Sequence, residues 1–303
     1  MTVDRFGARA TSGNDERSEL GEGPVWDAHE GCLRWVDSEV GAVFRGFLDG
    51  DDLRIDDVRL LGEKIGSLTP ATDGGLLVAG ERAVHIFDAE GILRASIPVI
   101  AEGVRSRLND GTVDPAGRFL VGSIRLDDRV RSESVWAIGP DRTVREVITG
   151  VTVSNGIGFS PDGRTLYHVE TRPGAIRAFD YDVATGTAAN MRNILVCGAT
   201  PDGLAVDVNG DLWVAFFGEG EVRCISPEGM VRAVIEVNAP NVTCPEFVGT
   251  ALDRLVITTA RFRMAVDERD RWPDAGAVFV AHPAIAGLAV PVWTGSTDRS
   301  GSR

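Results

Sequence analysis

Repeated turn signals predict that this chain of 303 residues folds as an all-β, six-bladed propeller with four-stranded blades. The first observation is a polar turn between two apolar segments, which recurs at Gly31, Gly74, Gly117, Gly163, Gly210 and Asp253. The second is the regular interval, because successive turns are separated by 43, 43, 46, 47 and 43 residues. The third is that about four strand-like segments fit each interval, as in propeller blades of about 45 residues.

Each repeat opens with a predicted β-hairpin. The six hairpins read PVWDAHEGCLRWVD, LTPATDGGLLVAG, GTVDPAGRFLVGS, GIGFSPDGRTLYHVE, LAVDVNGDLWVAF and EFVGTALDRLVITT. Turns such as DPAG, SPDG and VNGD supply the Pro, Asp, Asn and Gly that a tight reversal needs. The flanking runs are rich in Val, Leu, Ile, Phe and Trp, as strands are. A second pair of short segments follows, for example AIRAFDYDVATG in the fourth repeat. A pair of packed sheets would not predict so even a period.

Composition limits the class of protein and its partners. We expect one domain over residues 1–303, with residues 1–17 as a flexible tail. A formal net charge of -14 argues against nucleic acid and anionic membranes as partners. The first twenty residues lack the apolar stretch of a secretory signal. Four scattered cysteines without a CxxC motif predict free thiols and a cytoplasmic location. The sequence pattern indicates no particular oligomeric state.

Equivalent positions on the innermost strands of a propeller form a ring around its central channel. Counting eight residues back from each turn, and nine in the first repeat because its turn reads as one residue longer, gives Glu22, Gly66, Asn109, Asn155, Asp202 and Pro245. Four of these six positions carry a side-chain oxygen at the start of an apolar strand. NDG, SNG and PDG are common turn sequences, so each alone favours a simple turn. Their shared register instead favours a ring of ligands.

Such a ring suits a hard divalent cation. Carboxylate and amide oxygens are the ligands that these ions prefer, and a buried polar group is costly unless it is paired or coordinates something. Two carboxylates, Glu22 and Asp202, supply compensating charge. The pattern leaves the metal open among Ca, Zn, Mn, Mg and Fe, and it predicts no organic cofactor.

Five stretches resemble the gluconolactonase and regucalcin family, also called senescence marker proteins. They are LGEGPVWD, RLNDGTVDPAGRF, SNGIGFSPDGRTLYH, PDGLAVDVNGDLWVA and APNVTCPEF with ITTAR. The resemblance implies that Glu22, Asn155 and Asp202 are the protein ligands of one divalent metal. It implies that Arg107 and Asn109 hold a lactone substrate. The blade-six stretch NVTCPEF is more similar to the bacterial sugar-acid lactonases than to the animal proteins.

One segment departs from the family pattern. Asp127 falls where some members carry a substrate-binding glutamate, but it lies here in the charged stretch SIRLDDRVRSES. A stretch of this kind is usually a solvated loop. If it instead folds over the channel mouth, we expect Asp127 to contact substrate and to select among lactones.

The resemblance implies metal-dependent hydrolysis of a sugar lactone, such as gluconolactone or a pentonolactone, to the aldonic acid. A bound metal can polarise the carbonyl and lower the pKa of a water. Asp202 would take a proton from that water, and Arg107 would contact sugar oxygens or stabilise charge on the lactone oxygen. Two other classes remain open: an esterase or phosphotriesterase using the same site, and a non-catalytic calcium-binding propeller.

Overall fold

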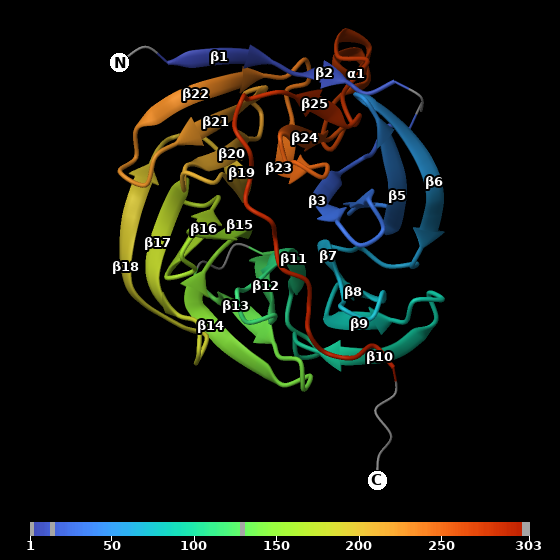
Figure 1. The fold of residues 1–303 in the computed structure, drawn as a ribbon, viewed down its shortest axis with the longest axis vertical. Helices are drawn as coiled ribbons and strands as arrows, with labels where there is room; N and C mark the ends of the chain where they lie inside the picture. The colour runs from blue at the N-terminus through green and yellow to red at the C-terminus, as the bar shows by residue number, and fades with distance from the viewer. Residues whose placement is uncertain (1–2, 13–15, 128–130, 299–303) are drawn as a thin grey trace.

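The protein is a six-bladed β-propeller, as the sequence predicts. The computed structural model describes residues 3–12, 16–127 and 131–298, and within them the chain forms six sheets around a central channel (Figure 1). In four sheets the strand order follows the chain from the channel outward, and neighbouring strands are antiparallel; the other two sheets follow the same order but add an N-terminal strand at the outer edge. This arrangement is the up-and-down sheet of a propeller blade.

The first three blades follow one another along the chain. Blade one contains β3 (Gly21–Asp27), β4 (Cys32–Asp37), β5 (Ala42–Asp49) and β6 (Asp52–Leu60). Blade two contains β7 (Ser67–Pro70), β8 (Leu76–Ala79), β9 (Ala83–Phe87) and β10 (Leu93–Pro98). Blade three contains β11 (Ser106–Val113), β12 (Phe119–Arg125), β13 (Glu133–Ile138) and β14 (Val144–Val151).

The remaining blades bring the two ends of the chain together. Blade four contains β15 (Ser154–Phe159), β16 (Thr165–Glu170), β17 (Ala175–Asp182) and β18 (Thr187–Val196). Blade five contains β19 (Pro201–Val206), β20 (Leu212–Phe216), β21 (Glu221–Ile225) and β22 (Val231–Glu236), with β1 (Asp4–Gly7) added outside β22. Blade six contains β23 (Val242–Val248), β24 (Arg254–Thr259), β25 (Phe279–Ala281) and β2 (Arg9–Ala10).

The N-terminal segment closes the ring, so the expectation of a flexible tail over residues 1–17 is wrong for residues 4–10. β1 pairs in parallel with β22, and β2 pairs with β25 as the outermost strand of blade six (Figure 1). The physical reason is the backbone left unpaired at the outer edge of blade six. Residues 282–298, the described residues after β25, form no further strand there, and the N-terminal residues supply the partner. Residues 1–2 and 13–15 lie outside the described part of the chain.

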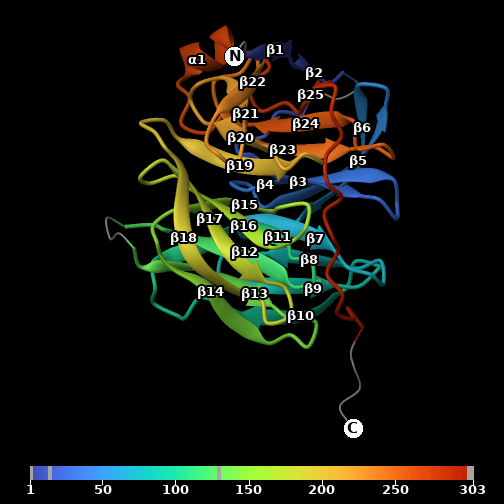
Figure 2. The same ribbon diagram turned by 60° about the vertical axis from the view of Figure 1, so that its left-hand side comes forward.

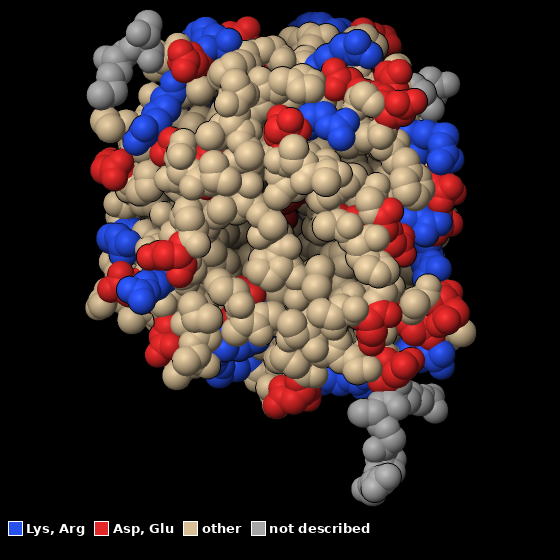
Figure 3. Space-filling model, in the orientation of Figure 1, with Lys and Arg blue, Asp and Glu red and all other residues tan. Residues whose placement is uncertain are grey.

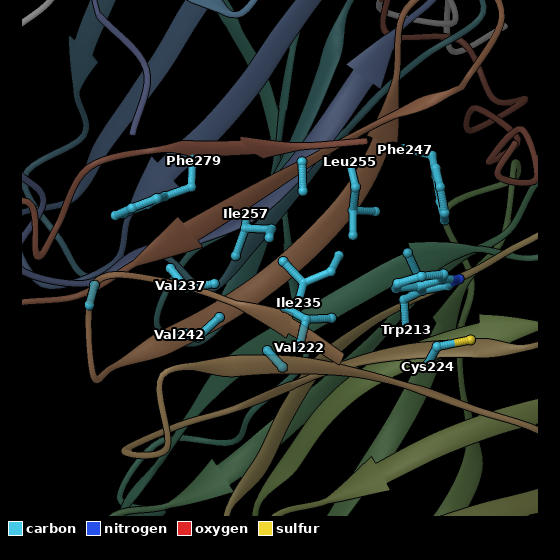
Figure 4. Packing of buried hydrophobic residues seen from close by; sticks show 14 of the residues in the cluster. Trp213, Val222, Cys224, Ile235, Val237, Val242, Phe247, Leu255, Ile257 and Phe279 are labelled. Atoms are coloured by element: carbon cyan, nitrogen blue, oxygen red, sulfur yellow. The ribbon is translucent and has the colours of Figure 1, made fainter. Parts of the chain in front are cut away.

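The hydrophobic core is divided among the blade interfaces. Each of six buried clusters joins residues of two neighbouring blades. Between blades five and six, for example, Trp213, Val222 and Ile235 pack near Phe247, Leu255 and Phe279 (Figure 4). Burying apolar area between every pair of neighbours, at about 25 cal/mol per Å², stabilises the closed ring more than any separate blade.

The hairpin turns confirm the register that the repeat predicts in five blades. The amide of Gly117 donates to the carbonyl of Asp114, and that of Gly210 to Asp207, each closing a turn over the same number of residues. In blade one the amide of Gly31 donates to Asp27, so this turn is one residue longer, as the sequence analysis assumed. This longer turn places Glu22 in the same register as Asn109 and Asp202.

The register of blade six differs by one residue from the prediction. Its turn closes where the amide of Leu252 donates to the carbonyl of Gly249, and not at Asp253. Leu252, rather than Asp253, therefore corresponds to the turn glycines, and it shares their positive φ. The ring position of this blade is consequently Cys244 and not Pro245.

Helix is scarce in the described residues. One short helix, α1 (Val266–Arg271), lies between β24 and β25 and buries none of its side chains. Among the described residues, no helix is long and apolar enough to cross a membrane. All four cysteines are described, and each is a free thiol.

Candidate metal centre and active site

The structure brings the four predicted ring residues together at the starts of four inner strands. Glu22 lies on β3, Asn109 on β11, Asn155 on β15 and Asp202 on β19, and each is at most 7% exposed. A shift in β-pairing falls at or beside the ring position on each of these strands. Such bulges re-aim side chains, and here they recur at the level of the ring.

Glycines let the inner strands approach closely beside the ring. A Cβ atom on Gly156 would lie 2.5 Å from the backbone nitrogen of Leu204 on the next inner strand. On Gly203 it would lie 2.4 Å from the sulfur of Cys244. These positions therefore require glycine, which explains why a glycine directly follows the ring residue in the sequences SNG and PDG.

A chain of hydrogen bonds joins the amide residues of the ring. Arg107 Nη1 donates to Asn109 Oδ1 at 2.9 Å, and Asn109 Nδ2 donates to Asn155 Oδ1. Asn155 Nδ2 donates to Thr171 Oγ1 at 2.6 Å, and that hydroxyl donates to the carbonyl of Pro201 at 2.8 Å. This network fixes both amides relative to blades three, four and five.

The acidic side of the ring contains a carboxylate that the sequence analysis missed. Oxygen atoms of Glu22 and Asp110 and the sulfur of Cys244 all lie within 4.8 Å of one another. Asp110 is 4% exposed, and its Oδ1 has no hydrogen-bond partner in the described structure. The NDG sequence contained the signal: the bulge at Asn109 allows both consecutive polar side chains to face the channel.

Burial and mutual repulsion control the charges of these carboxyl groups. Burial raises the pKa of Glu22 well above its ordinary value, and the charges of Asp202 and Asp110 raise it further. Burial and then Asp110 likewise raise the pKa of Asp202. Burial raises the pKa of Asp110 to about 7, against the opposing charge of Arg107. A bound cation would therefore stabilise the ionised forms of these three buried carboxyl groups.

The residues fit a hard divalent cation. Glu22 and Asp202 offer carboxylate oxygens and Asn155 offers an amide oxygen, all of which such ions prefer. The Oδ1 of Asp110 has no hydrogen-bond partner in the described structure, and the pKa values of Glu22 and Asp202 stay raised although the charge of Arg107 lowers them, so Arg107 alone does not offset the burial of these groups. The thiol of Cys244 is a poorer match, because burial raises its pKa well above the ordinary value.

The positive charge of Arg107 acts on all three carboxyl groups of this cluster and lowers their pKa values. Arg107 is 8% exposed, and its Nη1 also donates to the carbonyl of Leu108 at 2.9 Å. Burial lowers the pKa of Arg107, and the charges of Glu22 and Asp110 act in the opposite direction. It lies at the start of β11, two residues before Asn109, so the structure places the predicted substrate pair together.

Asp127 pairs with an arginine of its own segment. Its carboxylate accepts two hydrogen bonds from Arg125, Nε to Oδ1 at 2.7 Å and Nη2 to Oδ2 at 2.8 Å. The neighbouring amide of Leu126 donates to the carbonyl of Arg105, which places the segment beside the start of β11. Residues 128–130 of the charged stretch lie outside the described residues. A substrate contact by Asp127 would have to share this carboxylate with Arg125.

The fold and the ring define a six-bladed propeller with an acidic and amide-lined site in its channel. The family description "SMP-30/Gluconolactonase/LRE-like region" matches residues 20–261. The chain belongs to this family.

Individual relatives are similar over nearly the whole chain. The chain is 33% identical to a 6-deoxy-6-sulfogluconolactonase of Pseudomonas putida, covering 92% of this chain and 96% of that protein. It is 30% identical to regucalcin of Danio rerio over the same shares. Among solved structures, a calcium-binding protein, regucalcin, from Agrobacterium tumefaciens superposes with a TM-score of 0.88 at 25% identity, covering 97% of this chain and 99% of that one.

Proposed function

We propose that this protein is a divalent-metal-dependent lactonase that opens a sugar lactone to the corresponding aldonic acid. The observation that carries the proposal is the convergence of Glu22, Asn155 and Asp202 from three blades in a buried channel beside Arg107. The name of the Pseudomonas putida relative, a sugar lactonase 33% identical to this chain, supports the same reaction class.

Glu22, Asn155 and Asp202 would hold the metal. When bound, it supplies a Lewis acid for the lactone carbonyl and lowers the pKa of a nearby water. It also stabilises the ionised forms of Glu22 and Asp202, which burial alone disfavours.

Asp202 would act as the proton carrier. Its carboxylate accepts a proton from the water that attacks the carbonyl carbon, and a C–O bond forms. The bond between that carbon and the ring oxygen then breaks, and Asp202 returns the proton to this oxygen. The products are one free hydroxyl and one carboxylic acid, so atoms and charge balance without any other reactant.

Arg107 and Asn109 would hold the sugar. Arg107 can donate to the lactone's oxygens with the N–H groups that Asn109 and Leu108 leave free. Its charge also stabilises the negative charge that develops on the carbonyl oxygen. Because the bond from Arg107 holds Asn109 in the amide chain, the same arginine couples the substrate site to the proposed metal ligand Asn155.

Substrate class and metal identity are tested together. The purified protein is stripped with a chelator, reloaded separately with Ca, Zn, Mn, Mg or Fe(II), and assayed on D-glucono-1,5-lactone and D-xylono-1,4-lactone. We expect activity that disappears with the metal and returns with at least one ion. Turnover of aryl esters or organophosphates in excess of both lactones would instead assign the site to an esterase or phosphotriesterase. Binding of calcium without turnover of any substrate would support a non-catalytic propeller.

Replacing Arg107 by alanine should lower kcat/KM for the lactone by about 100-fold, since one lost electrostatic contact to a developing oxyanion is worth about that much. The metal content of the variant should equal that of the unaltered protein. Arg105→Ala is the matched control, because Arg105 lies two residues earlier and is exposed. Loss of metal from Arg107→Ala would show that the arginine only supports the ring through Asn109.

A further inference from the structure

A cavity lies in the channel, lined by the inner strands beyond the ring as they run away from Arg107. Its volume is about 310 Å³, at the low end of the range for small-molecule pockets. The inner strands run from the ring toward it: its lining includes Asp110 and Val113 of β11 and the later residues of β15 and β19. Arg107, Asn109, Asn155 and Asp202 are absent from its lining. The ring therefore separates this cavity, here called the rear pocket, from the proposed substrate site.

The walls of the rear pocket are apolar. Val25, Ile157, Leu204, Phe247 and Leu288 contribute to them. None of the described residues that line it is a lysine, arginine or histidine. An anionic ligand would therefore find no charged partner there, and an apolar body would replace water at the walls.

Three carboxyl groups, Asp110, Asp162 and Glu246, are among the polar residues that line the rear pocket, and two of them are buried deeply enough to bind a ligand's charged group. Asp110, at its inner end, is 4% exposed and keeps an oxygen without a hydrogen-bond partner in the described structure. Glu246 of β23 lines the pocket further along, and burial raises the pKa of its carboxyl to about 8. A buried acceptor without a partner costs about 1–3 kcal/mol, which a donor placed in the pocket would recover. Figure 3 shows acidic atoms at depth in a hollow near the middle of this face.

A strap formed by residues 288–293 crosses the opening of the rear pocket. Its first end is fixed where the amide of Leu288 donates to Val206, and its last where the amide of buried Trp293 donates to Pro70. Between them, residues 289–292 make no backbone hydrogen bond to any described residue. The C-terminal segment runs along this face in two views (Figures 1 and 2). A strap anchored only at its ends can open without unfolding a blade.

We propose that the rear pocket binds a small organic cation, a primary amine with an apolar body of about eight carbon atoms. The ammonium group donates to Asp110 and Glu246, and the body lies between the apolar walls under the strap. Three observations select this class: the orphaned acceptor, the absence of basic lining residues and the apolar walls. The rear pocket meets the proposed metal site at Asp110, whose oxygen lies within 4.8 Å of an oxygen of Glu22, but occupation of the pocket does not depend on lactone turnover.

The test measures binding of three ligands of equal shape to the metal-loaded protein by calorimetry: 2-phenylethylamine, 2-phenylethanol and phenylacetate. We expect one site for the amine, binding of the alcohol at least about tenfold weaker, and no heat from the acid. Equal affinities for amine and alcohol, or no binding at millimolar amine, would overturn the proposal.

Two variants locate the site independently. Glu246→Gln should weaken binding of the amine by about tenfold and leave binding of the alcohol unchanged, because the carboxyl group can ionise when the ammonium group binds and an amide cannot. Glu228→Gln, on an exposed turn of blade five, is the matched control. Ala289→Trp, on the exposed part of the strap, should block both ligands without altering lactone turnover. Amine binding that survives both variants, or that metal removal alone abolishes, would place the ligand at the ring and contradict the proposal.

Discussion

Replacing Asp202 by alanine is expected to abolish metal-dependent lactone hydrolysis, with kcat/KM falling at least about 1,000-fold. The variant loses a proposed metal ligand and the proposed proton carrier at once, and a positioned general base alone contributes about 10²–10⁴-fold. The fold should persist, because the substitution removes one of three repelling buried acids and leaves the apolar interfaces intact. Steady-state kinetics, metal analysis and thermal unfolding check these three results.

Asp202→Asn separates the two roles. An amide retains one ligand oxygen, as Asn155 has, but accepts no proton at neutral pH. We expect Asp202→Asn to keep some bound metal at high metal concentration and still to lack turnover. Asp180→Asn, the same change on an exposed residue of β17, should be indistinguishable from the unaltered protein. Near-normal turnover in Asp202→Asn with metal bound would show that another group carries the proton.

The sequence predicted the architecture because a propeller repeats a local signal. A hairpin needs glycine, proline, asparagine or aspartate at fixed places, and the spacing between turns follows from the four strands of each blade. The ring residues followed from the same register, since equivalent positions meet at the axis. Glu22 is the clearest case, because the one-residue-longer turn of its blade had to be recognised before it aligned with Asn109.

The errors arise where structure depends on distant contacts. No local pattern shows that residues 4–10 pair with β22 and β25, because these partners lie at the other end of the chain. The ring position of blade six was misplaced because Leu252 takes the positive φ that glycine takes in the other turns. Asp110 was missed since strict alternation along a strand would point it away from the channel, and only the bulge allows it to face inward.

The rear pocket also could not be predicted from the sequence. Its walls come from the far ends of inner strands in several blades, and its cover comes from the C-terminal segment. Glu246 precedes Phe247 in a strand that reads as ordinary core, so nothing local marks its carboxyl as a pocket group. The residues that line this pocket come together only in the closed ring of blades.

The last prediction concerns pH and metal together. In the metal-free protein, the free energy of unfolding should fall as pH rises from about 4 through about 7. The sign follows from the raised pKa values: over this window folded Asp110 holds a proton that the unfolded chain has released, and Glu22 and Asp202 shift in the same direction. Raising the pH therefore removes protons that stabilise only the folded state. Glu246, whose pKa is about 8, acts in the same direction but lies outside the proposed ligand set.

A divalent cation at the ring should reverse this trend, because it replaces the protons as the neutralising charge. Protons compete with metal for Glu22 and Asp202, so metal affinity rises with pH. We expect the Tm difference between metal-loaded and chelator-treated protein to widen from about pH 5 to about pH 8, reaching about 5–10 °C at 100-fold excess over Kd. Thermal unfolding at matched ionic strength measures it. Asp202→Asn should show a much smaller difference, whereas Asp180→Asn should retain it in full. A difference that narrows with rising pH would mean that the metal binds away from these carboxylates.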